Sequence, residues 1–175
     1  ELFYEINKEN INFLNLHEEN NNLMYVFEND KIKNILSKSM LKKKIKIINK
    51  NISDLDELKY FDLVILCLGG QSVIYNKLLK ERSINKDYHE IAVTGYVKHN
   101  LKKINTSQFF LKEGPLAILP FSKNCFSFVW SLKKEFHKRN LKSLNKLVRG
   151  KILEVIKSNI NLNISNIQSY PISLG

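Results

Sequence analysis

The chain has 175 residues, of which 43% are hydrophobic and 26% are charged, and this composition argues against global disorder. The net charge is +11, but only three of the 28 basic residues are arginines, which bind phosphates and guanine edges in a bidentate manner that lysine cannot match. We therefore expect no nucleic-acid partner. No apolar run reaches the roughly 18 residues that a membrane-spanning helix needs, so none is expected.

The first half of the chain predicts strands that alternate with helices. A helix should begin at Asn29 or Asp30, because either side chain can cap a first turn and apolar residues then recur at helical spacing. The run over residues 61–68 is almost continuously apolar, which is typical of a strand covered on both faces of a parallel sheet. The other expected elements are strands over residues 2–6, 11–16 and 45–48 and a helix over 72–80.

The second half predicts consecutive strands and one long helix. The helix should run from about residue 141 to residue 157, with its apolar side chains on one face. This change of pattern near residues 80–86 predicts a domain boundary and an α/β (α+β) fold class, with a mainly antiparallel second sheet under the helix. Cys67 and Cys125 lie in apolar runs and are expected to be buried thiols. The expected strands cover residues 88–97, 109–111, 114–120, 126–130 and 164–172.

The most informative segment is an expected β-hairpin. Residues 114–120 read G-P-L-A-I-L-P and residues 127–131 read S-F-V-W-S, with a short polar turn between them. Because proline cannot donate to the hydrogen bonds of a sheet, Pro115 and Pro120 should bracket the first strand. The pattern resembles the middle of the FAD-dependent aromatic-ring hydroxylases, the class A flavoprotein monooxygenases. It is most similar to the branch that hydroxylates polyprenylated phenols in ubiquinone biosynthesis.

A second resemblance lies at the end of the apolar run. The family carries D-G-x-x-S-x-x-R there, and this chain has Gly69 at the glycine position and Ser72 at the serine position. Leu68 stands at the Asp position and Tyr75 at the Arg position. In the family this turn lies beside the flavin and the path of the nicotinamide, where an apolar side chain and a phenol would weaken polar contacts. Shorter similarities are D-L-V-I over residues 62–65, Y-x-x-x-A over 88–92 and Y-P-I over 170–172.

The resemblance implies both an architecture and an activity. Residues 1–82 would be the end of a Rossmann-like FAD-binding domain, and residues 83–175 a substrate-binding β-sheet domain with one long helix. The complete protein would be an oxidoreductase, a flavoprotein monooxygenase that uses FAD and NAD(P)H to hydroxylate a polyprenyl phenol. No catalytic acid, catalytic base or metal site is recognised. Gly69 and Ser72 would contact the cofactor, and the substrate pocket would be lined by Leu116, Ile118, Phe128 and Trp130.

Two further motifs of the family have no counterpart in this sequence. These are the G-x-G-x-x-G turn that places a pyrophosphate at a helix N-terminus, and a later G-D motif beside the flavin. We therefore expect the chain to be the middle of a longer enzyme and to bind FAD poorly when alone. The resemblance places that enzyme in the cytoplasm, with peripheral contact to the inner membrane and to a ubiquinone-biosynthesis complex.

Other interpretations of the same residues stay open. Leu68 and Tyr75 also suit a catalytically degenerate homologue that acts as a scaffold in the same pathway. A basic nucleic-acid-binding module would require lysines that converge on one face, with exposed aromatic residues between them. The lysines at 42–44 could instead contact an anionic membrane surface. Core packing alone would explain each pocket residue taken individually.

Overall fold

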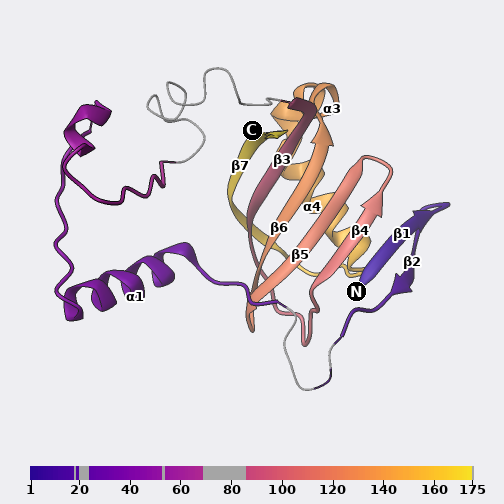
Figure 1. Ribbon diagram of the computed structural model, residues 1–175. Coiled ribbons are helices and arrows are strands. Elements are labelled where there is room, and N and C mark those ends of the chain that lie inside the picture. Colours follow the sequence, from indigo (N-terminus) through magenta and orange to yellow (C-terminus); the bar gives the residue numbers. More distant parts are fainter. Residues whose placement is uncertain (18, 20–23, 53, 69–85, 175) are drawn as a thin grey trace. The chain divides into compact units, whose positions relative to one another are not determined.

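The computed structural model describes residues 1–17, 19, 24–52, 54–68 and 86–174, and it divides into two compact units (Figure 1). The first unit combines Glu1–Ile32 with Asp87–Ser173, and the second combines Lys33–Lys86 with Leu174–Gly175. The first two strands therefore belong with the second half of the chain. The boundary expected near residue 82 lies outside the described residues, so the assignment of 1–82 and 83–175 to two functional domains stays a prediction.

A seven-stranded sheet forms the first unit, in the order β2-β1-β4-β5-β6-β3-β7. The β1–β4 pair is parallel, whereas the β1–β2, β3–β6, β4–β5 and β5–β6 pairs are antiparallel. The α+β class and the mainly antiparallel sheet are therefore confirmed. The strands are β1 (Leu2–Ile6), β2 (Glu9–Leu14), β3 (Lys86–Lys98), β4 (Ser107–Leu111), β5 (Gly114–Ser122), β6 (Cys125–Lys133) and β7 (Asn163–Leu174).

Helix α4 (Leu144–Val155) covers one face of this sheet, as the sequence predicts, and lies behind it in Figure 1. It follows α3 (Lys134–Asn140) and a 3₁₀ turn, Leu141–Ser143, so the expected single helix from residue 141 begins as a 3₁₀ turn. One stripe of α4 is buried and joins the core side chains of the sheet. The buried stripe consists of Leu144, Val148, Ile152 and Val155, the spacing of one helical face.

The second unit differs from the sequence prediction. Helix α1 (Asn29–Lys42) is present, and a 3₁₀ turn follows at Leu55–Leu58, but the strands expected over residues 45–48 and 61–68 are absent from the described structure. A strand needs a hydrogen-bonding neighbour, and no described strand pairs with either segment. Their apolar side chains are consequently exposed, and the thiol of Cys67 is exposed instead of buried.

No helix in the described part of the chain is both long enough and apolar enough to cross a membrane.

Candidate substrate-binding sheet

The predicted hairpin is confirmed as the β5–β6 pair, whose register places Leu116 opposite Trp130 and Ile118 opposite Phe128. Both prolines lie inside β5 instead of bracketing it. Pro120 is accommodated because the register shifts between Pro120 and Ser122, and an irregularity of this kind is where a sheet tolerates proline.

The first glycine of the motif is fixed by the neighbouring strand. Gly114 has a φ of +132°, and a Cβ built on it would lie 2.0 Å from the carbonyl oxygen of Ser131. Its own carbonyl accepts a hydrogen bond of 3.2 Å from the indole Nε1–H of Trp130. Gly114 and Trp130 therefore join the start of β5 to β6, which gives both ends of the sequence motif a structural role.

The four predicted pocket residues lie together on the face of the sheet that α4 covers, which we call the back face. Alternation along β5 and β6 points them all to this side, and each is at most 1% exposed. They are core residues in this structure. The prediction that they contact a substrate is not tested by it. The four are Leu116, Ile118, Phe128 and Trp130.

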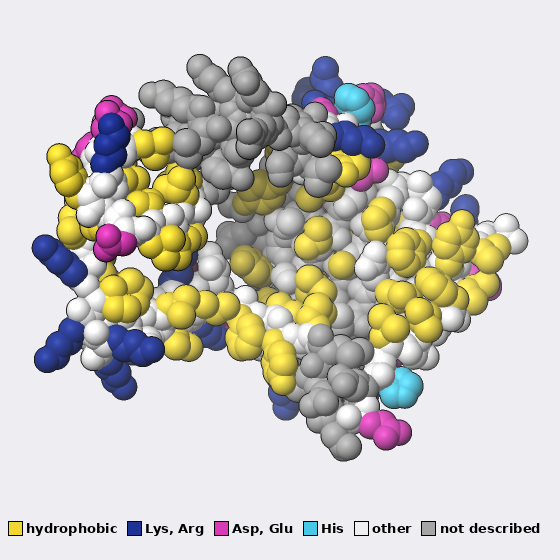
Figure 2. All heavy atoms as spheres, viewed as in Figure 1, with side chains coloured by type: hydrophobic (Ala, Val, Ile, Leu, Met, Phe, Trp, Pro, Cys, Tyr) yellow, Lys and Arg dark blue, Asp and Glu magenta, His cyan; other side chains and the backbone are white. Residues whose placement is uncertain are grey.

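The opposite side of the sheet, the front face, carries the alternate residues of the same strands and faces the viewer in Figures 1 and 2. Figure 2 shows apolar side chains spread across it. On this face, Tyr96 of β3 and Phe121 of β5 form an edge-to-face aromatic pair, with their ring centroids 5.8 Å apart. The half-buried residues that define the centre of the front face are Ala92, Thr94, Ala117, Leu119, Ser127 and Val129.

The centre of the front face has no titratable side chain, so it offers shape and apolar contact without acid–base chemistry. Sequence reasoning missed these residues because alternation shows that two faces exist but does not show which one a helix will cover.

The titratable groups with shifted pKa values lie elsewhere. Lys151 of α4 forms ion pairs of 3.1 Å with Glu113 and 3.0 Å with Glu154. Burial works to lower the pKa of Lys151, but these hydrogen bonds and charges outweigh it and raise the pKa. Burial lowers the pKa of His99, whose Nδ1 accepts the Leu101 backbone N–H at 3.1 Å.

The predicted cofactor contacts Gly69 and Ser72, and Tyr75 beside them, lie outside the described residues. Leu68, which precedes them, is 40% exposed, and its apolar side chain offers no hydrogen bond. The described residues contain no group of His, Cys, Asp and Glu side chains that could hold a metal ion. Because Gly69 and Ser72 lie outside the described residues, the contact of this chain with FAD stays a prediction.

Comparison with known proteins adds little to this geometry. No protein family matches the chain, and no curated protein sequence matches it. Among solved structures, the flavin-dependent halogenase CmlS is similar with a TM-score of 0.42 and 10% sequence identity, over 55% of this chain. The chain spans 20% of that protein's length. A likeness at this level carries no functional conclusion.

Proposed function

We propose that this chain is the sheet-bearing part of a FAD-dependent monooxygenase and that the front face forms one wall of its substrate cavity. The observation that carries the proposal is the broad front face, whose centre has no titratable side chain, on a sheet whose other face is already covered by α4. The hairpin motif supports it, because the segment that resembles the aromatic-ring hydroxylases supplies the centre of this face.

In this proposal the chain's own residues bind and orient the aromatic ring and keep water away from it. Leu119 and Val129 supply apolar contact, and the Tyr96–Phe121 pair offers aromatic surface at one side. FAD, reduced by NAD(P)H in the complete protein, would supply the oxygen chemistry. The buried residues Leu116 and Trp130 would act through the strand, by fixing the positions of their front-face neighbours.

The proposed substrate is a polyprenylated phenol of ubiquinone biosynthesis. A phenol ring with a long isoprenoid tail needs an apolar wall, and the front face provides one without a charged group at its centre. Such tails lie in membranes, so peripheral contact through the lysines at 42–44 belongs to the same proposal, with each lysine near an anionic surface contributing about 1 kcal/mol.

The test introduces a charge on the front face of the complete polypeptide that contains this chain. Leu119→Glu should abolish formation of the hydroxylated phenol while the bound flavin, read from its absorbance, stays at the wild-type level. Asn124→Glu adds the same charge in the exposed turn of the same hairpin and should leave both unchanged.

Leu119→Trp separates a blocked cavity from a fold disrupted by a half-buried charge, because it adds volume without charge. It should also stop product formation with flavin retained. Full activity in both Leu119 variants would remove the front face from the substrate site.

A second candidate is favoured by one described residue. Leu68 cannot make the polar contact that an Asp would make, which suits a catalytically degenerate homologue with a scaffolding role. The same preparation distinguishes the two functions: a complete polypeptide that folds but binds no flavin and does not oxidise NAD(P)H would support the scaffold and reject the monooxygenase.

A further inference from the structure

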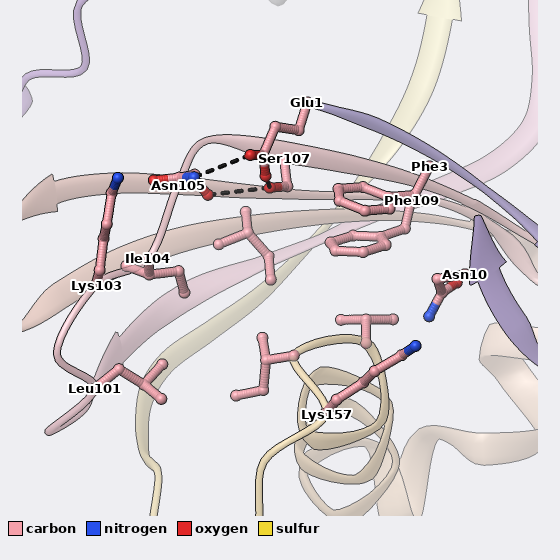
Figure 3. A pocket seen from close by; sticks show the side chains of 13 residues that line it. Glu1, Phe3, Asn10, Leu101, Lys103, Ile104, Asn105, Ser107, Phe109 and Lys157 are labelled. Carbon is pink, nitrogen blue, oxygen red and sulfur yellow. Dashed lines mark hydrogen bonds between the residues drawn. The ribbon is translucent and has the colours of Figure 1, made fainter. Parts of the chain in front are cut away.

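A separate cavity of about 390 Å³ lies on the α4 side of the sheet, away from the front face (Figure 3). It is open to solvent and is lined by residues of β1 and β2, of β4 and β5, of the loop over residues 101–105 and of the C-terminal end of α4. Its volume falls within the range of sites for small organic ligands.

The body of this cavity is apolar. Phe3 of β1 and Phe109 of β4 stack with their ring centroids 4.7 Å apart and their planes 16° apart, and they form one wall. Figure 3 shows these two rings on the cavity side of the sheet. The remaining apolar lining consists of Leu101, Ile104, Ile118, Val155 and Ile156.

One end of the cavity already holds a carboxylate. Glu1 accepts hydrogen bonds of 3.0 Å from Asn105 Nδ2 and 3.3 Å from the Ser107 hydroxyl (Figure 3). Lys103 lines the cavity as well. A second anion would be repelled by the Glu1 carboxylate, and no other acidic residue lines the cavity among the described residues.

The other end presents two donors with no acceptor between them. Figure 3 shows the amide nitrogen of Asn10 and the ammonium group of Lys157 pointing toward one another. Two such groups cannot satisfy each other, whereas a carboxylate between them would accept from both. Lys157 is exposed and takes part in none of the ion pairs found in the described residues, so its ammonium group is available to an anion at the rim of the cavity.

Lys157 also occupies a backbone position that favours glycine. Its φ is +49°, and the bonds Lys157 N–H to Glu154 O and Ser158 N–H to Leu153 O form the Schellman arrangement that ends α4. Glycine adopts this left-handed conformation without the steric cost that lysine bears. The lysine therefore brings a cation to the cavity at a position where backbone preference argues against it.

We propose that this cavity binds a small amphipathic carboxylate, with its apolar body against the Phe3–Phe109 wall and its carboxylate between Lys157 and Asn10. The site is independent of the front face, because its lining lies on the other side of the sheet.

The test is calorimetric titration of the chain with octanoate, with octanol as the uncharged probe of similar size. Octanoate should bind saturably with one site per chain, and octanol should bind at least about fivefold more weakly because it lacks the charge-assisted hydrogen bonds. Lys157→Gly should lower octanoate affinity by a similar factor without loss of folding, since glycine suits the left-handed position.

Two further variants locate the ligand. Lys146→Gln neutralises an exposed lysine of the same helix outside the cavity and should leave octanoate affinity unchanged. Ile104→Trp fills the cavity from its loop and should abolish binding. Equal affinities for octanoate and octanol, equal affinities of the wild type and Lys157→Gly, or binding that survives Ile104→Trp would each overturn the proposal, as would the absence of saturable binding.

Discussion

Gly114 shows how a single residue can set the geometry of the hairpin. Its φ of +132° is a conformation that residues with a side chain rarely adopt, and a Cβ would lie 2.0 Å from the Ser131 carbonyl oxygen, which belongs to the backbone and cannot move aside cheaply. The Trp130 indole is hydrogen-bonded to the carbonyl of the same glycine. Glycine is therefore required here by both backbone conformation and close approach.

Gly114→Ala should destabilise the protein by about 3 kcal/mol, because it adds conformational strain to a direct clash with β6. The matched control is Gly150→Ala in α4, where a Cβ would meet nothing within 4 Å. Alanine should stabilise that exposed helix position by about 0.5–1 kcal/mol. Urea unfolding monitored by Trp130 fluorescence would measure both changes, and equal effects of the two substitutions would contradict the argument.

His99 makes stability depend on pH. It is 6% exposed, and burial lowers its pKa below the ordinary value of 6.5, so the unfolded chain binds a proton more readily than the folded one. The contribution of His99 to the free energy of unfolding is therefore fully present above about pH 6.5, and it is lost as the pH falls from there toward the folded-state pKa.

His99→Asn keeps an oxygen acceptor for the Leu101 N–H but does not titrate. The wild type should lose more unfolding free energy than this variant between about pH 7 and pH 5.5, an interval that contains the ordinary histidine pKa of 6.5. Unfolding curves at the two pH values test this, and the difference between the proteins isolates His99 from the carboxylates. Parallel losses in both proteins would show that His99 does not titrate differently on folding.

At the scale of the elements, α4 is joined to the sheet by apolar packing and by one charged contact. Its buried stripe meets the core, and Lys151 reaches Glu113 in the turn between β4 and β5. The Lys151 side chain is only 10% exposed, so this pair is screened less by water than a surface ion pair. Together these contacts fix which face of the sheet is covered and leave the front face for another role.

The sequence predicted the strands of the first unit and the helices α1 and α4. Short apolar runs located β1 and, by their alternation, β2, the prolines and the polar turn located the hairpin strands, and helical spacing located α1 and α4. The start of β2 was predicted two residues late, because the β1–β2 turn uses Asn7 and Lys8 at φ values of 51° and 67°, without the glycine that usually marks such a turn. The side of the hairpin that receives a substrate was not predictable, since alternation is symmetric between two faces until the helix is placed.

The two strands wrongly predicted in the second unit, over residues 45–48 and 61–68, share one physical cause. The run over residues 61–68 has strong strand propensity, yet propensity alone does not form a strand without hydrogen-bonding partners, and the described chain provides none for it. Its side chains remain in solvent, with Leu63 77% exposed and Ile65 76% exposed. Propensity predicted a buried strand where the structure supplies neither a sheet nor a core.

At the scale of the whole molecule, the two units should differ sharply in local stability. The first unit contains the hydrophobic core, whereas no described residue between 33 and 68 is buried. Because opening free energy follows buried apolar contact and protected backbone hydrogen bonds, amide hydrogens of β5 and β6 should exchange slowest and those of residues 61–68 fastest. Hydrogen exchange followed by mass spectrometry of the whole chain measures both in one sample. Protection of residues 61–68 equal to that of β5 would show that this segment has strand partners in solution, and the continuous apolar run would then have the buried role that its sequence favours.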